Sequence, residues 1–452
     1  MTTANQPLQL GISNRQILQI ALPISLAILV PQLNFITNNI FLGHFSTEAL
    51  AVASITGVYY LIFAGIGYGL NNGLQALISR RAGEQKISEI GKLFTQGVYI
   101  SLAIAAIGIL ITYFIAPHIL KLALSSNEKY EETISFLRIR IWGLPFLYIF
   151  QMRNALLVGT NQSKLLVIGS LAETISNVIF DYGFIFGKFG LPAMGFNGAA
   201  VASIIAEFTG MFVIFLVIRR KGISQRFSLF KNYRFDKKNI KLILSMSSPI
   251  IFQHAISIMS WEFFFILIER NQANEYDLAI SNTMRNIFGF FGVFIWAFAA
   301  TANTMVSNVI GQGRKEEVVL LVRRIVILST GIAILICIFL NIFPGLLLTV
   351  YGQPKLFIEA AIPVVRVISL AMVLMSFATV WLNAVTGTGN SKITLLIEVF
   401  AIIFYCFYVY FILEKFKLSI TFGWMAEWIY WISLFSLSFL YIRSGKWKGK
   451  ML

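Results

Sequence analysis

The chain has 452 residues, of which 57% are hydrophobic and only 12% are charged, and its mean hydropathy is +0.77. Soluble domains carry about 25% charged residues, so this composition excludes an ordinary soluble protein and indicates a lipid environment. The net charge of +16 would also suit a nucleic-acid-binding protein, but the basic residues gather in loops between apolar segments. This placement indicates the cytoplasmic membrane surface and excludes nucleic acid as a partner.

Apolar segments near or above the length of about 20 residues that spans a bilayer recur along the whole chain. Twelve such spans are expected, and we expect them to begin near residues 15, 48, 92, 131, 164, 197, 240, 277, 318, 355, 392 and 419. No soluble domain is left between them. Prolines at 23, 31, 145 and 249 fall in or near spans and are expected to bend or interrupt helices, because proline removes a backbone hydrogen bond.

The loops predict the orientation of the spans. Residues 219–241, between spans six and seven, contain nine Lys or Arg and only one acidic residue, Asp236. Basic loops stay on the cytoplasmic side, and the loops on the opposite side are acidic, as at Glu128, Glu131 and Glu132. With an even number of spans, both termini are expected in the cytoplasm of a multi-pass protein of the cell membrane.

The two halves of the chain resemble each other. GTNQSK at 159–164 returns as GTGNSK at 387–392, an offset of 387 − 159 = 228, and the same offset pairs Arg138 with Arg366. We therefore predict a duplicated protein with an N-lobe at 1–222 (helices 1–6), a cytoplasmic linker at 223–238 and a C-lobe at 239–452 (helices 7–12). Six is an even number, so the repeats are parallel and related by a pseudo-two-fold axis along the membrane normal. The predicted fold is an all-α membrane protein of two six-helix lobes, an architecture typical of transporters.

Span five carries the most suggestive polar residues. Glu173, Asn177 and Asp181 recur every four residues and therefore share one helical face. Ionisable groups inside a span are costly and usually face an interior cavity, so a cation or proton could bind there. The alternative is that these side chains hold neighbouring helices together or reach the headgroup interface.

In span seven, Glu262 follows Trp261, and we expect a buried carboxyl suited to reversible protonation. Arg153, Arg285, Trp261 and the deeply placed His254 are candidates for the lining of a substrate cleft. The other interpretation of the arginines is that they reach the interface or pair with carboxylates. The sequence contains no metal-ligand cluster and no nucleophile signature, so we do not expect an enzyme.

The chain resembles the multidrug and toxic compound extrusion (MATE) family of cation-coupled antiporters. The resemblance rests on NNIFLGHFSTEALA, ALISRRAGEQ, ALLVGTNQSK and, above all, SNVIFDYGFIFG followed by GLPAMGFNGAAVASIIAE, and it extends over nearly the whole chain. It implies export of amphipathic organic compounds, coupled to H⁺ or Na⁺ by alternating access. No other cofactor is expected, and no metal other than Na⁺ at Asp181; the partners are small organic substrates and lipid, and a monomer is expected.

The resemblance also assigns roles to residues. Asn177 and Asp181 match an Asn and an Asp of the family's cation site, Ser203 stands where a hydroxyl is common, and Glu262 matches a glutamate of some subgroups. Asn38 stands where the family usually has an aspartate, which removes one charge from this site. Because several arginines lie within spans, a flippase for a lipid-linked or anionic precursor is the alternative function.

Overall fold

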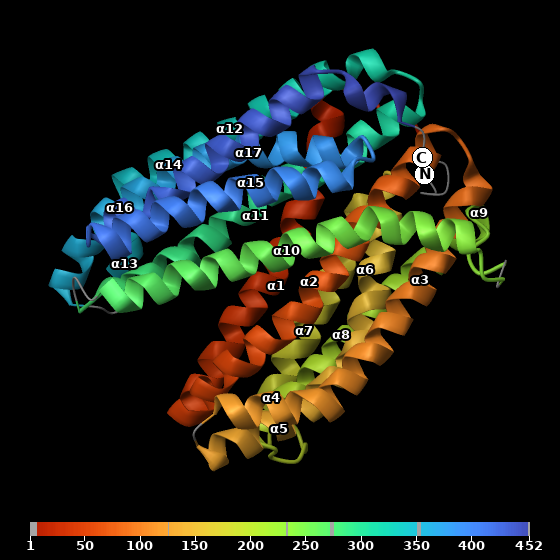
Figure 1. Cartoon of the computed structure of the whole chain (residues 1–452). Coiled ribbons are helices and arrows are strands. Elements are labelled where there is room, and N and C mark those ends of the chain that lie inside the picture. The colour runs from red at the N-terminus through yellow and green to blue at the C-terminus, as the bar shows by residue number, and fades with distance from the viewer. Residues whose placement is uncertain (1–6, 125, 232–233, 272–274, 350–353, 451–452) are drawn as a thin grey trace. The chain divides into compact units, whose positions relative to one another are not determined.

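The computed structural model describes residues 7–124, 126–231, 234–271, 275–349 and 354–450, and within these ranges every regular element is a helix (Figure 1). Twelve helical segments of 19 to 36 residues are long and apolar enough to cross a membrane. Eleven of them begin within five residues of the positions expected from the sequence, and the second begins at Ile55 inside a helix that starts at Thr47. The twelve-helix all-α fold is confirmed, and this is a multi-pass membrane protein.

The helices follow one another with short connections. In the first half of the chain they are α1 (Asn14–Phe45), α2 (Thr47–Gly83), α3 (Ile87–Leu110), α4 (Ala116–Ala123), α5 (Asn127–Arg140), α6 (Leu144–Gly159), α7 (Leu166–Phe186), α8 (Phe196–Arg220) and α9 (Ile223–Arg226). In the second half they are α10 (Lys237–Asn271), α11 (Asp277–Gly311), α12 (Val318–Ile342), α13 (Pro344–Thr349), α14 (Lys355–Gly387), α15 (Ser391–Val409), α16 (Ile420–Trp424) and α17 (Ala426–Arg443). Short π-helical or 3₁₀ turns (Ile111–Ile115, Ile141–Gly143, Ser163–Leu165, Lys315–Glu317, Tyr410–Lys415 and Lys446–Gly449) extend or join several of them.

Contacts divide the chain into two compact units. Unit 1 comprises residues 1–8 and 26–251, and unit 2 comprises residues 9–25 and 252–452. The division by packing therefore lies inside α1 and α10, whereas the lobes expected from the sequence divide at the linker. In both helices the chain passes from one unit to the other two residues after a proline, which is Pro23 in α1 and Pro249 in α10. These prolines occupy similar places in the two repeats.

The fourth span is broken as expected. Helix α5 ends at Arg140, a 3₁₀ turn covers Ile141–Gly143, and α6 restarts at Leu144 with Pro145 in its first turn. Proline fits the first turn of a helix because its missing N–H would have no intrahelical partner there. Pro23, Pro31 and Pro249, in contrast, lie within continuous helices.

Residues 187–195 connect α7 to α8, and the segment GLPAMGFNG at 190–198 covers the end of this connection and the first turn of α8. Gly187 ends α7 with a φ of 66°, which is a left-handed conformation that glycine adopts without steric cost. The Met194 N–H donates to the Phe184 carbonyl at 2.7 Å, which folds the connection back onto the end of α7. A β-carbon at Gly198 would overlap with the same carbonyl. This part of the sequence signature therefore fixes how α8 packs against α7.

In unit 1, the segment that follows α8 packs along α3. The Gln96 side chain donates to the Arg234 carbonyl at 3.0 Å and accepts from the Asp236 N–H at 3.3 Å. The rings of Tyr99 and Phe235 lie 5.1 Å apart. The linker expected at 223–238 thus contains α9 and is attached to unit 1.

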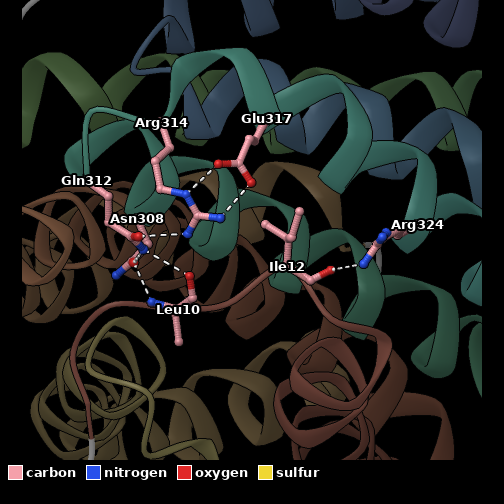
Figure 2. A network of polar contacts seen from close by, with 7 residues as sticks. All are labelled: Leu10, Ile12, Asn308, Gln312, Arg314, Glu317 and Arg324. Atoms are coloured by element: carbon pink, nitrogen blue, oxygen red, sulfur yellow. Dashed lines mark hydrogen bonds and ion pairs between the residues drawn. The ribbon is translucent and has the colours of Figure 1, made fainter.

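In unit 2, the chain that precedes α1 is fastened to the end of α11 and to α12 (Figure 2). The Leu10 N–H donates to Asn308 Oδ1 at 2.9 Å, and its carbonyl accepts from Gln312 Nε2 at 2.9 Å. Arg324 donates to the Ile12 carbonyl at 3.1 Å. Both backbone groups of Leu10 are therefore satisfied by side chains of α11 or the residue after it.

Candidate functional site

The most unusual polar group in unit 1 is Asp181 on α7. Its side chain has no exposed surface, and neither carboxylate oxygen has a hydrogen-bond partner among the described residues. Asn177, one turn earlier on the same face, is also buried, with 1% of its surface exposed. Most buried polar atoms in proteins are hydrogen-bonded, so an unpartnered buried carboxylate requires an explanation. A bound cation or proton would provide one.

Helix α1 lies against α7 beside this position. The rings of Phe41 and Tyr182 are 6.1 Å apart, and Thr174 donates to the Val30 carbonyl at 3.4 Å. Asn38 is one turn before Phe41, is half-buried, and its buried Oδ1 has no partner. An amide oxygen can ligate a cation, but the amide group carries no net charge. Asn38 therefore attracts a cation less strongly than an aspartate at the same position would.

Ser203 and Glu173 lie on the paired helices α8 and α7, and both are half-buried. Glu173 packs against Gly210 of α8, where an added β-carbon would lie 3.2 Å from its Oε2. The electrostatic influence of Arg140 reaches both Glu173 and Asp181. The face expected from the four-residue spacing therefore forms, and an arginine from the preceding span supplies positive charge near it.

That arginine is held by a carboxylate of α8, Glu207. Arg140 donates from Nη1 to Glu207 Oε2 at 2.9 Å and from Nη2 to Glu207 Oε1 at 2.5 Å. The Tyr60 hydroxyl donates to Glu207 Oε1 at 3.0 Å, and the Arg140 guanidinium lies 3.7 Å from the Tyr60 ring centroid. A bidentate pair of this kind is strong and directional. It joins α2, α5 and α8.

The arginines expected near a substrate cleft have other contacts. Arg153 donates to the Met211 carbonyl and lies 5.4 Å from the Phe215 ring, so it is bound to α8. Arg285, in unit 2, is exposed and lies 5.0 Å from the Phe265 ring. Arg138 and Arg366 are exposed as well. Their role in substrate binding stays a prediction.

In unit 2, Glu262 is exposed on α10, so the burial expected for it is wrong. The buried face of this part of α10 is formed by other positions, among them Phe264, Leu267 and Ile268. Trp261 is half-buried and packs against Phe288 and Trp424 at 6.1 and 5.8 Å. Exposing a carboxyl group to lipid is costly, so an exposed carboxyl within a span favours a position that faces a water-filled cavity. The coupling role of Glu262 stays a prediction.

His254 is half-buried on α10, and its Nε2 is buried without a hydrogen-bond partner. Its assignment to a substrate cleft is neither supported nor opposed by a contact of the described residues.

No pattern in the sequence singles out Glu398, which lies at the centre of a polar cluster in unit 2. It is 1% exposed on α15 and accepts hydrogen bonds from Gln253 at 3.1 Å and Ser257 at 2.8 Å, both on α10. The Tyr430 hydroxyl of α17 is the third donor. The cluster joins three separate helices, α10, α15 and α17, so no local spacing could have revealed it.

Comparison with known proteins agrees with this architecture. A sequence model of the MatE family matches residues 23–183 and again 249–411. The chain belongs to the MatE family. Both matches begin at a proline, Pro23 or Pro249, and the first ends two residues after Asp181. The double match also confirms the internal repeat. MatE proteins are transporters, so this chain is a transporter and not an enzyme.

One relative within the family matches nearly the whole chain, and others match about half of it. A probable multidrug resistance protein NorM of Thermotoga maritima is 23% identical over 441 residues, which cover 96% of this chain and 93% of the relative. A second protein of that name, from Synechocystis, is 28% identical over 52% of this chain and 51% of its own length. The alignments with the Synechocystis protein and with several other relatives cover about half of each relative's length.

Solved structures show the same fold. A crystal structure of a MATE protein in complex with MaL6 superposes with a TM-score of 0.90 at 16% identity and covers 98% of both chains. An outward-facing multidrug resistance MATE transporter of the MOP superfamily gives a TM-score of 0.88 at 17% identity, again over 98% of both chains. None of these comparisons supports the flippase alternative.

Proposed function

We propose that this MatE protein is an antiporter that exports amphipathic organic compounds in exchange for H⁺ or Na⁺. Family membership supports transport, and the names of the relatives support drug-like organic substrates. We place the protein in the cell membrane with both termini in the cytoplasm, because the most basic loops would then face the cytoplasm. We also propose that it is a monomer.

The observation that carries the coupling proposal is the environment of Asp181. Its two oxygens are buried without a hydrogen-bond partner, and the Oδ1 atom of Asn38 on the adjacent helix is also buried without one. Leaving an ionised carboxylate uncompensated in a low-dielectric interior is costly. A proton or Na⁺ at Asp181 removes this cost, since the proton neutralises the group and Na⁺ uses the oxygens as ligands.

Antiport requires that the ion and the substrate favour different conformations. A ligand that binds both conformations equally tightly shifts no equilibrium. Neutralising Asp181 by binding an ion changes the electrostatics around Glu173, which packs against α8, and around Arg140, which joins α5 to α8. In this account, occupation of Asp181 changes the packing preference of α7 and thereby the conformational balance.

The test is dye transport in proteoliposomes under imposed gradients. Vesicles loaded with a fluorescent organic cation are exposed to an H⁺ gradient, to a Na⁺ gradient, or to neither. The proposal predicts dye movement that follows one gradient and fails in Asp181→Asn. The matched control Glu359→Gln, which changes an exposed carboxylate of α14, should transport normally. Equal transport with all gradients absent would overturn the coupling.

A further inference from the structure

The two repeats contain a carboxylate at equivalent positions, and its hydrogen-bonding and ion-pair partners differ between them. Ala206-Glu207 in the last span of the first repeat corresponds to Ala426-Glu427 in the second, with an offset of 427 − 207 = 220. Glu207 is neutralised by Arg140 and accepts a hydrogen bond from Tyr60. The offset of 228 relates the spans before this one, and with it the position of Arg140 corresponds to 140 + 228 = 368, which is Ile368.

The other partner is also lost. Tyr60 corresponds to 60 + 228 = 288, which is Phe288 and has no hydroxyl. The structure supports this register, because Trp428, next to Glu427, donates to the carbonyl of Val367, next to Ile368, at 2.9 Å. Likewise Phe288 stacks on Trp431, one turn after Glu427, with centroids 6.5 Å apart. The second repeat keeps the carboxylate and lacks both groups that stabilise its charge in the first.

Glu427 is nevertheless as deeply buried as Glu207. It is 1% exposed, its Oε2 has no hydrogen-bond partner, and no basic side chain among the described residues forms an ion pair with it. The nearby Tyr405 hydroxyl, within its electrostatic influence, is also buried and unpartnered. Burying an ionised carboxylate without a counter-charge is strongly unfavourable. Glu427 therefore needs a positive charge from outside the chain.

The second repeat also adds a carboxylate that the first does not have. Glu398 corresponds to 398 − 228 = 170, which is Ser170. It lies on α15, next to α17, and both Glu398 and Glu427 act electrostatically on Tyr430. Three side-chain donors surround Glu398, and none of them carries a charge. Two buried carboxylates thus share one region of unit 2 that lacks an arginine.

We propose that Glu427 and Glu398 form a proton-binding centre in unit 2, distinct from Asp181 in unit 1. A proton takes the place that Arg140 fills in the first repeat, and the Tyr430 hydroxyl donates to Glu398 from the same helix that carries Glu427. The proton is favoured over Na⁺ because the oxygens of Glu398, Ser257 and Tyr430 already contact one another, with Ser257 and Tyr430 3.3 Å apart. The inference goes beyond the proposed function, since it requires no transport.

The other titratable groups of the surrounding helices do not replace this proton. Arg366 on α14 and Arg285 on α11 are exposed, as is Glu262 on α10. His254 of α10 has a buried, unpartnered Nε2 and forms no ion pair among the described residues. On α15 and α17 themselves, Tyr405, Cys406 and Tyr430 carry a positive charge in neither protonation state, so none of them can serve as the counter-charge.

Infrared difference spectroscopy of the purified full-length protein tests the proposal directly. A protonated carboxyl group has a carbonyl stretching band that an ionised carboxylate lacks. The spectrum of the wild type at neutral pH minus that of Glu398→Gln/Glu427→Gln should contain this band. The difference from Glu359→Gln, which changes an exposed carboxylate, should not. Absence of the band from the first difference spectrum would overturn the proposal.

A second variant tests the same idea without removing the carboxylates. Ile368→Arg restores the missing arginine, and Ala371→Gly provides the space that Gly143 provides in the first repeat, since 143 + 228 = 371. The band should become smaller in the double variant, because the new arginine pairs with ionised Glu427 and only Glu398 can still contribute. An unchanged band in this variant would contradict the proposal.

Addition of NaCl in place of choline chloride at constant pH should leave the wild-type band unchanged. Loss of the band on adding Na⁺ would overturn the assignment to a proton. These spectra do not depend on dye transport, so a failure here and a failure of the antiport assay are separate results.

Discussion

Arg140 and Glu207 form a bidentate ion pair whose two N···O distances are 2.9 and 2.5 Å. The side chains are 12% and 6% exposed, so the pair is largely shielded from solvent. Tyr60 contributes both a hydroxyl donor to Glu207 and an aromatic face to Arg140. Each charge is tolerated in the interior only because the other is present.

Removing one member of this pair should therefore destabilise the protein more than removing both. Arg140→Leu or Glu207→Leu is expected to cost about 3–5 kcal/mol, the usual effect of leaving a buried charge uncompensated. The double variant should cost less than either single variant, because it leaves no buried charge uncompensated. Reversible unfolding in detergent, analysed as a double-mutant cycle, measures this. Strict additivity would show that the pair is not coupled.

Gly143 makes room for the same ion pair. A β-carbon at this position would overlap with Glu207 Oε2 and Arg140 Nη1. Gly143→Ala should destabilise the protein by about 1–3 kcal/mol, as overpacking usually does. Gly65→Ala on α2 is the control, because nothing lies within 4 Å of its β-carbon position. Thermal unfolding of both variants should show a loss only for Gly143→Ala.

Asn38→Asp should strengthen cation binding in unit 1. The added carboxylate supplies a second charge near Asp181, and attraction between opposite charges is large where water is excluded. We expect the ion concentration for half-maximal dye transport to fall about tenfold, which corresponds to about 1.4 kcal/mol. Asn286→Asp, at an exposed position of α11, should change nothing. An unchanged half-maximal concentration in Asn38→Asp would place Asn38 outside the cation site.

The attachment of the N-terminal segment to unit 2 can be tested by hydrogen exchange. Asn308 is fully buried, and its Oδ1 accepts from the Leu10 N–H and from Gln312 (Figure 2). Asn308→Ala should speed exchange of the Leu10 amide about fivefold to tenfold, since a hydrogen bond contributes about 1 kcal/mol. Asn286→Ala on the same helix is the control. Equal exchange rates in both variants would mean that this contact does not protect the segment.

Much of the fold could be predicted from sequence because hydropathy is a local property. Twelve spans, the break before Pro145 and the duplication all follow from patterns within one segment or from one fixed offset. Burial of Asp181 agrees with the four-residue spacing that places it on the same helical face as Asn177.

The environments of the other carboxylates depended on information that is not local. Glu262 was expected to be buried because Trp261 precedes it, but consecutive residues on a helix point about 100° apart. Phe264 and Ile268 form the buried face, and Glu262 lies off it. Glu398 could not be placed because its donors, Ser257 among them, come from helices more than 30 residues away in sequence. Only tertiary packing brings such groups together.

The central claim is that an ion bound at Asp181 is exchanged for substrate. Coupling between two ligands is reciprocal, so substrate must move the ion even without an imposed ion gradient. The direct measurement is ion flux, followed by pH- and Na⁺-sensitive dyes in proteoliposomes, after a fluorescent organic cation is added outside. We predict that one ion moves in the direction opposite to the organic cation in the wild type and in Glu359→Gln. Neither ion should move in Asp181→Asn. Undiminished ion flux in Asp181→Asn would contradict the central claim.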